Sequence, residues 1–176
     1  MTAAGRRKRP RPRRWTRLDV PVLPPKLAAL DADGLRAQTE HTDVELVDLD
    51  LTAAHLTGLS LETARLKSCR LDGAELRRLR CRRVVFDTCD FANSRWLDCD
   101  LGDVAFLDCR LTGASLAGGR LDDVMLRDCQ LRLAKLSHLG RPHALLDACD
   151  LRGALLMESD LSDTHFTACD LSDAEA

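Results

Sequence analysis

Residues 99–113 read Cys99-Asp100-Leu101-Gly102-Asp103, Val104-Ala105-Phe106-Leu107-Asp108 and Cys109-Arg110-Leu111-Thr112-Gly113. Each of these pentads has a large apolar residue at its centre and a small residue two positions before it. Stepping by five from Leu46 to Leu171 gives an apolar residue at every position except Arg141. All four Phe residues and Trp96 fall in this frame, so most of the bulkiest apolar side chains share one structural position.

The flanking positions are also sorted by size and polarity. The frame two residues before the centres, from Val44 to Cys169, holds mostly Ala, Cys, Val, Ser, Thr or Gly, and the frame two residues after them is mainly polar. Apolar residues spaced two and then three apart match neither the 3.6-residue period of an α-helix nor the alternation of a β-strand. The spacing predicts a chain that turns a corner every five residues, with the large and the small residues both inside.

A second, longer period groups the pentads in fours. One column of small residues recurs every twenty positions as Cys69, Cys89, Cys109, Cys129, Cys149 and Cys169. The column five residues further on, taken every twenty positions from 54 to 154, is alanine at each position except Ser94. A twenty-residue coil of four pentads stacks each of these sets in one column. We interpret the cysteines as small apolar fillers of a tight inward position rather than as a metal or redox site.

The pentads resemble the pentapeptide-repeat family, whose units follow the pattern A(D/N)LXX. Close matches are the pentads at 74–78, 99–103, 149–153 and 169–173, which begin Ala74-Glu75-Leu76, Cys99-Asp100-Leu101, Cys149-Asp150-Leu151 and Cys169-Asp170-Leu171. The resemblance implies an all-β fold, the right-handed quadrilateral β-helix. At twenty residues a coil and ~4.8 Å between stacked strands, residues 42–176 would form a solenoid of about 6–7 coils.

The residues before the repeat are predicted to form two further regions. Residues 1–41 hold 10 Lys/Arg against 4 Asp/Glu, whereas residues 42–176 hold 16 against 24. Residues 1–17 are predicted to be a disordered basic tail, because they are rich in arginine and contain two prolines. Residues 18–41 are predicted to be a linker and an N-terminal cap, because the open edge of a first coil invites pairing unless it is covered.

Composition also bears on location and class. No apolar run approaches the ~18 residues that a membrane-spanning helix needs. The basic start is followed by Trp15-Thr16-Arg17-Leu18-Asp19 instead of an apolar signal segment. Eight cysteines without an export signal favour free thiols in a reducing compartment, so we expect a cytoplasmic protein.

Two groups of charged residues are candidate contact sites for a partner. Five arginines surround one predicted corner, at which Leu79 and Cys81 take the inward positions: Arg77, Arg78, Arg80, Arg82 and Arg83. These arginines are expected to project outward, either as a solvated patch or as a contact for an acidic group. Six aspartates fall on or beside the side of the centres 101, 121 and 161: Asp100, Asp103, Asp122, Asp123, Asp160 and Asp163.

No catalytic, metal or cofactor residue is assigned. The five histidines are expected in outward or loop positions, and a coil filled by its own side chains offers no concave pocket for chemistry. The stretch Gly140-Arg141-Pro142-His143 interrupts the repeat, and since Pro cannot donate a ladder hydrogen bond, a bulge or an outward loop is expected there.

Three functions remain in competition. The first is a non-catalytic protein-binding scaffold that acts through its outer faces, because stacked coils present long faces of patterned charge. The second follows from the family resemblance, since some members mimic duplex DNA and bind gyrase. The third is association with nucleic acid or an anionic surface through residues 6–17. We expect a protein partner and no cofactor. Each of the three functions is compatible with a homodimer.

Overall fold

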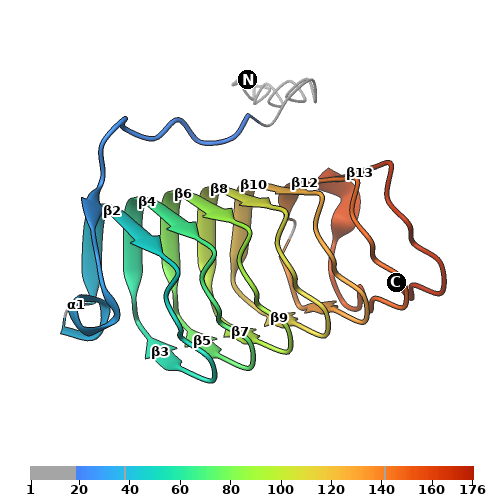
Figure 1. Ribbon diagram of the computed structural model, residues 1–176. Coiled ribbons are helices and arrows are strands. Elements are labelled where there is room, and N and C mark those ends of the chain that lie inside the picture. Colours follow the sequence, from blue (N-terminus) through green and yellow to red (C-terminus); the bar gives the residue numbers. More distant parts are fainter. Residues whose placement is uncertain (1–18, 38, 141) are drawn as a thin grey trace, which may run out of the picture.

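The chain forms a parallel β-solenoid of about seven turns (Figure 1). The computed structural model describes residues 19–176 except 38 and 141. Two adjoining faces of the solenoid are formed by the longer strands β2 (Glu40–Val47), β4 (Ser60–Lys67), β6 (Arg80–Asp87), β8 (Asp100–Leu107), β10 (Arg120–Arg127), β12 (His143–Asp147) and β13 (Thr164–Thr167). Another face is formed by the short strands β3 (His55–Thr57), β5 (Glu75–Arg77), β7 (Arg95–Leu97), β9 (Ser115–Ala117) and β11 (Lys135–Ser137).

The strands stack in register at an interval of twenty residues. Leu66 of β4 pairs with Phe86 of β6, and Phe86 pairs with Phe106 of β8, all in parallel. On the remaining face, isolated parallel bridges run from Asp50 to Arg70 and on to Asp170 at the same interval. The predicted fold class, a quadrilateral β-helix of four pentads per coil, is therefore confirmed. We number the coils one to seven from the residues 40, 60, 80, 100, 120, 140 and 160.

Each corner is turned by a residue in the left-handed region. Asp43, Asp48 and Ala53, which lie two positions after successive centres, have φ values of 56°, 55° and 51°. The same conformation recurs at this position almost throughout the solenoid. Because left-handed backbone costs an L-residue roughly 1–2 kcal/mol and is tolerated best by Gly, Asn and Asp, this frame is the polar one in the sequence.

The pentad centres fill the interior. Phe91, Trp96 and Leu101 are at most 1% exposed. The Phe86 and Phe106 rings stack with centroids 4.7 Å apart, and Phe91 meets Phe86 edge-on at 5.3 Å. This aromatic cluster gathers the largest side chains of coils three and four in one place. His41, which we expected in an outward or loop position, is instead 8% exposed at the first inward position of coil one.

The single serine of the alanine column, Ser94, is explained by its hydrogen bond to Trp96. The Trp96 indole Nε1–H donates to Ser94 Oγ at 2.9 Å, and Ser94 Oγ donates to the Phe91 carbonyl at 2.7 Å. Ser94 is 0% exposed, so its hydroxyl provides the hydrogen-bond acceptor that a buried indole requires.

The cysteine column consists of free thiols that bond to the backbone. Cys89 Sγ lies 3.4 Å from the Leu66 carbonyl oxygen of the preceding coil, and the other members of the column make the equivalent contact. Cys99, two pentads away on the opposite face, is 5% exposed, and burial raises the pKa of its thiol to about 11. These cysteines are fillers with a weak hydrogen bond, in agreement with their interpretation from the sequence.

The N-terminal region packs on the first coil. β1 (Ala28–Ala29) pairs in parallel with β2, with Ala28 opposite Val44. α1 (Ala32–Ala37) follows, and Leu35 is 3% exposed within the core cluster. The tail predicted at residues 1–17 lies outside the described residues.

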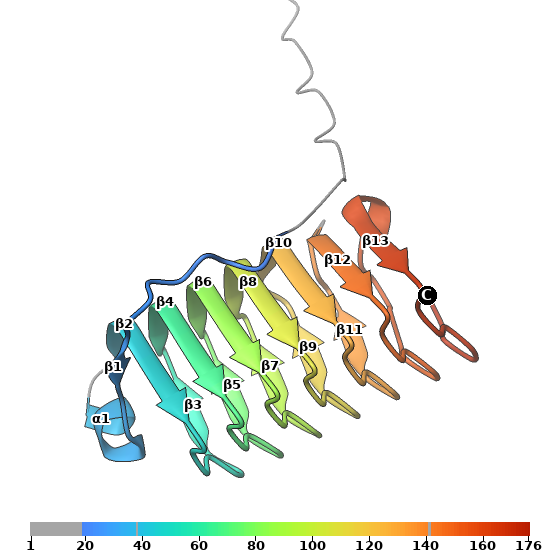
Figure 2. The same ribbon diagram turned by 45° about the horizontal axis from the view of Figure 1, so that its top comes forward.

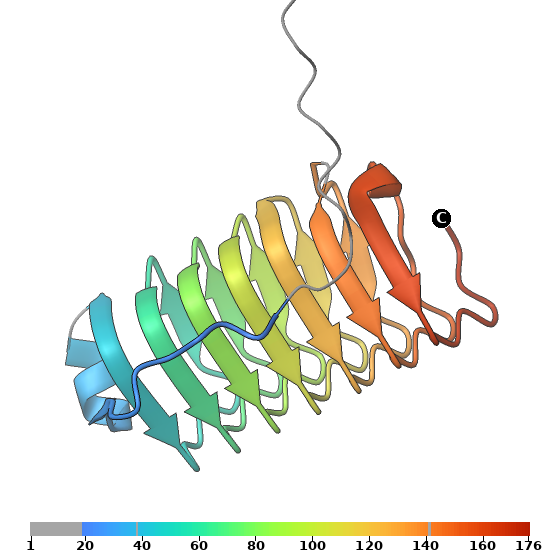
Figure 3. The ribbon, with the colours of Figure 1, turned by 90° about the horizontal axis from the view of Figure 1, so that it is seen from above.

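Residues 19–27 run along the outside of the solenoid, over the face of β4, β6, β8 and β10 (Figure 1, Figure 2 and Figure 3). Val85, Ala105 and Met125 belong to β6, β8 and β10, over which the segment runs, and they occupy outward positions directly before inward centres, yet they are 5%, 0% and 1% exposed. Pro21 is also buried. The segment therefore covers an apolar stripe on the outer surface, which the repeat pattern alone does not require.

The length of this segment matches the distance it covers. Val20 and Ala28 are eight residue steps apart, and at ~3.1 Å per step an extended, proline-rich chain of that length spans ~25 Å. Five strand spacings of ~4.8 Å, from β1 to β10, amount to ~24 Å. A fully extended conformation is thus sufficient to reach Met125.

The Ser94–Trp96 hydrogen bond is testable by a double-mutant cycle. Ser94→Ala should lower the free energy of unfolding by about 1–3 kcal/mol, because it leaves the buried indole N–H without an acceptor. In a Trp96→Leu background, which restores the residue at the equivalent positions 76, 116 and 136, the same substitution should cost less than about 1 kcal/mol. Urea unfolding provides the measurement, and equal costs in both backgrounds would contradict the assignment.

Two prolines test the covering segment. Pro21→Asp places a carboxylate at a buried position, whereas Pro24→Asp makes the same change at an exposed one. We expect Pro21→Asp to release the segment, to increase the fluorescence of a dye that binds apolar surface several-fold, and to lower the melting temperature. Pro24→Asp should behave like the wild type. If both variants respond alike, residues 19–27 do not cover the stripe.

Candidate functional site

The corner between the two faces of the longer strands carries a charged hollow. The hollow has a volume of about 350 Å³ and is lined by residues of coils two to five: Glu62, Arg82, Arg83, Gly102, Asp103, Asp122 and Asp123. These residues lie one and two positions after the inward centres 61, 81, 101 and 121, so the stacking of the coils aligns them in two adjacent columns. Two guanidinium groups and four carboxylates give the hollow a formal charge of −2.

Arg82 is held by one contact to the next coil and one within its own strand. Its Nη2 lies 3.0 Å from Asp100 Oδ2, and its Nη1 donates to the Cys81 carbonyl at 3.0 Å. A Cβ at Gly102 would lie 2.6 Å from Arg82 Nη1. The glycine in coil four therefore makes the room that the guanidinium of coil three needs.

Arg83 reaches back to coil two. Its Nη2 lies 2.9 Å from Glu62 Oε1, and its Nε donates to Thr63 Oγ1 at 3.2 Å. On its other side, Asp103 occupies the same corner column one coil on. Burial, and then the neighbouring charge of Asp123, raise the pKa of Asp103, while Arg83 opposes that shift. Carboxylates are thus crowded at the acidic end of the hollow.

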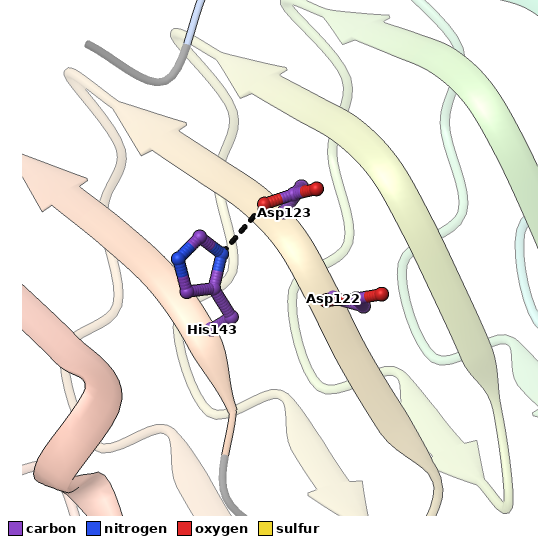
Figure 4. A group of neighbouring side chains, drawn as sticks. All are labelled: Asp122, Asp123 and His143. Carbon is purple, nitrogen blue, oxygen red and sulfur yellow. Dashed lines mark ion pairs between the residues drawn. The ribbon is translucent and has the colours of Figure 1, made fainter. Parts of the chain in front are cut away.

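The irregularity at 140–143 places a histidine beside this acidic end. Asp122 pairs with His143, whereas Val124 pairs with Ala144, so the register shifts by one residue between β10 and β12. By sequence spacing His143 is the corner residue of coil six, but it lies opposite Asp122 and lacks the positive φ that the corner residue has in coils one to five. Its Nδ1 lies 2.6 Å from Asp123 Oδ1, and the two side chains point toward each other from adjacent strands (Figure 4).

The expected bulge at this stretch is confirmed by the shift in register. Pro142 is buried, and Thr164 Oγ1 donates to its carbonyl oxygen at 3.2 Å. Arg141 lies outside the described residues. Since Pro142 turns inward between the core positions of coils five and seven, the interruption changes the path of the chain without opening the core.

The structure brings together part of each predicted charged group. Arg82 and Arg83 line the hollow with Asp103, Asp122 and Asp123, and Asp100 pairs with Arg82 at its margin. The remaining predicted residues are elsewhere. Arg77 pairs with Glu75 at 2.5 Å on the face of the short strands, Arg78 and Arg80 are exposed, and Asp160 and Asp163 lie at η1 (Leu161–Asp163) in coil seven.

Two residues of this region were missed by the sequence analysis. Glu62 and His143 were not assigned, although His143 stands twenty residues after Asp123 and forty after Asp103. Extending the twenty-residue columns to the outward frames would have found both of them.

The interior offers no comparable site among the described residues. Two voids inside the solenoid have volumes of about 40 and 20 Å³ and are lined almost entirely by apolar side chains. A catalytic pocket requires convergent polar groups, which these voids do not have. In the described part of the chain, no helix is both long and apolar enough to cross a membrane.

Several solved structures resemble the chain at low sequence identity. A trypsin-treated form of QnrB1, a plasmid-mediated fluoroquinolone resistance protein, is 17% identical, with 84% of this chain and 74% of that chain covered and a TM-score of 0.42. HetL, a pentapeptide-repeat protein of the cyanobacterium Nostoc sp. strain PCC 7120 involved in the regulation of heterocyst differentiation, is 17% identical, with coverages of 77% and 86% and a TM-score of 0.20. Rfr23, a pentapeptide-repeat protein of the cyanobacterium Cyanothece 51142, is 18% identical, with coverages of 74% and 90% and a TM-score of 0.28.

Family models match most of the solenoid, although no curated protein matches the sequence. A model described as a pentapeptide repeat region matches residues 79–156, and a model of eight pentapeptide repeats matches residues 45–78 and 143–174. Together with the corner in each pentad and the four-pentad coil, these matches show that the chain belongs to the pentapeptide-repeat family.

Proposed function

We propose that this solenoid is a non-catalytic scaffold that binds a protein partner at the charged hollow. The observation that carries the proposal is the hollow itself, in which arginines and carboxylates from four successive coils face solvent side by side. The stacked backbone holds these charges at intervals of ~4.8 Å. Fixed, patterned charge of this kind gives specificity and fast association in protein interfaces.

The ion pairs at the hollow are available for exchange with a partner. The side chains of Arg82 and Asp100 are 50% and 36% exposed, and those of Arg83 and Glu62 are 51% and 55% exposed. Pairs this exposed contribute about 0–1 kcal/mol to stability, so the fold does not depend on them. A partner can therefore replace one member of a pair at small cost.

The charge distribution also describes the partner. The two arginines lie toward coil three, and the carboxylates Asp103, Asp122 and Asp123 lie toward coils four and five. A segment that presents an acidic group to the first and basic groups to the second would be complementary. Arginine is over-represented among residues that dominate binding energy, which makes Arg82 and Arg83 the first positions to test.

A gyrase-binding DNA mimic is the alternative that the family resemblance implied. Duplex DNA carries one negative charge per ~1.7 Å of axis, or ~19 charges over ~32 Å, the approximate length of the solenoid. The charged hollow instead interleaves two arginines with four carboxylates. This arrangement favours a partner of mixed charge. Association with nucleic acid through residues 6–17 remains a separate prediction, testable by deleting residues 1–17 and measuring salt-dependent retention of DNA.

Charge reversal at the hollow tests the proposed function. Immobilised full-length chain should retain a protein partner from a cell extract, and Arg82→Glu/Arg83→Glu should reduce that retention about tenfold or more. Arg132→Glu/Lys135→Glu makes the same change of charge at two exposed positions outside the hollow, so retention should be unchanged. Circular dichroism would verify that both variants are folded, and equal loss in both would contradict a site at the hollow.

A supercoiling assay distinguishes the proposed scaffold from the gyrase-binding DNA mimic. Under the proposed function, micromolar protein leaves the supercoiling activity of DNA gyrase unchanged. The DNA mimic would instead be favoured if the wild type inhibits gyrase and Arg82→Glu/Arg83→Glu inhibits it more strongly. The double substitution adds negative charge to the corner.

A further inference from the structure

We propose that Asp122, Asp123 and His143 form a binding site for one divalent transition-metal ion such as Zn²⁺. The three side chains come from β10 and β12, and their potential ligand atoms all lie within 4.8 Å of one another (Figure 4). The site lies at the acidic end of the charged hollow, and it does not depend on the protein-binding function proposed above.

The donor set selects the class of metal. An imidazole nitrogen and carboxylate oxygens are common ligands of Zn²⁺ and of neighbouring transition metals, whereas Ca²⁺ and Mg²⁺ are bound almost entirely by oxygen. Three protein ligands with an open fourth position suit a tetrahedral ion completed by water. The thiols are unsuited to this site, because the cysteine side chains of coils five and six point into the core.

The geometry requires only side-chain adjustment. The His143 Nδ1 and Asp123 Oδ1 atoms are 2.6 Å apart, whereas two ligands of a tetrahedral zinc ion with bonds of ~2.0–2.1 Å lie ~3.3 Å apart. These two side chains would separate slightly, and the Asp122 carboxylate would rotate toward them. The backbone positions are fixed already, because Asp122 pairs directly with His143 between the two strands.

A second histidine–carboxylate pair provides an internal comparison. His138 Nε2 lies 2.6 Å from Glu158 Oε2, also at an interval of twenty residues, and both side chains are about two-thirds exposed. His143 and Asp123 are less exposed, at 21% and 33%, and Asp122 supplies the additional carboxylate. Among the described residues, only the His143–Asp123 pair therefore belongs to a three-ligand set, and the bulge places His143 opposite the third ligand, Asp122.

The electrostatic surroundings favour a cation. Asp103 adds a carboxylate next to Asp123, and the pKa of Asp103 is raised by burial and by the charge of Asp123. Arg83, the nearest cation to Asp103 in the column, is engaged by Glu62. A divalent ion between Asp122, Asp123 and His143 would offset this crowding. The hollow opens to solvent and gives the ion a path of entry.

Such an ion would join coils five and six. The bulge interrupts the regular pairing between β10 and β12 at the point where the corner residue of coil six loses its left-handed conformation. Ligands on both strands would connect the coils at that point. Metal binding is therefore expected to stabilise the folded chain as well as to occupy the site.

Zinc titration of the full-length, tag-free and metal-stripped chain tests the proposal. Competition against a chromogenic chelator should show one Zn²⁺ per chain, and saturation should raise the melting temperature by about 5 °C or more. His143→Gln should weaken binding at least about tenfold and abolish the thermal shift. Asp122→Asn should do the same, and because it leaves the His143–Asp123 pair intact, it distinguishes metal ligation from the loss of an ion pair.

His138→Gln is the matched control and should bind Zn²⁺ like the wild type. Co²⁺ spectra report the ligand type, and the proposed site predicts d–d bands without thiolate charge transfer. The proposal is overturned by absent binding, by binding that His143→Gln and Asp122→Asn both leave unchanged, or by a thiolate spectrum. Circular dichroism without metal checks that the variants are folded, and if His143→Gln fails that check, Asp122→Asn alone decides.

Discussion

A left-handed backbone corner once every five residues is the constraint on which this structure depends. Asp48, Asp98 and Asp128 adopt φ values of 55°, 54° and 55° at corners of three different coils. Each corner redirects the chain by one face, and four corners return it to a position one strand spacing along the axis. Both the large and the small residues of every pentad therefore point inward. The same constraint explains why Asp, Asn and Gly are common two positions after each centre.

Stacking converts this local geometry into function. Residues twenty positions apart become neighbours at ~4.8 Å, so a change in one outward column alters the surface directly. Coil three contributes Arg82 and Arg83 to the charged hollow, and coils four and five contribute Asp103 and Asp123. Because the interior is filled by the repeat's own side chains, the partner binding proposed above is restricted to such outer columns. The bulge in coil six is an exception to the corner rule, and it places His143 opposite Asp122 at the acidic end of the hollow.

The interior could be predicted from the sequence because two periods constrain it. The cysteine column, the alanine column and most centres occupy the predicted inward positions, although Leu171 in the last coil is 41% exposed. Ser94 was visible as an exception. Its partner was not, because the hydrogen bond to Trp96 depends on side-chain orientation. The repeat constrains outward residues only weakly, so the meeting of the arginines with Asp122 and Asp123 in one hollow was not recognised.

Two further features of the structure were not predicted from the sequence, and they have separate physical causes. Residues 19–27 lie outside the repeat, so their path over Val85, Ala105 and Met125 depends on apolar contacts that have no period. The pairing of His143 with Asp122 follows from a one-residue shift beside Pro142. A bulge could be expected from the proline, but its register depends on how Pro142 packs in the core. Both features arise where tertiary contacts override the local pattern.

Adjacent glycine substitutions test the left-handed corner most directly. Leu133 is a corner residue with a φ of 57° and is 61% exposed, while its exposed neighbour Arg132 has no positive φ. Urea unfolding should show that Leu133→Gly stabilises the fold by about 1 kcal/mol, because it relieves a left-handed L-residue. Arg132→Gly should destabilise it by about 0.5–1 kcal/mol. Equal destabilisation by the two substitutions would contradict the corner constraint.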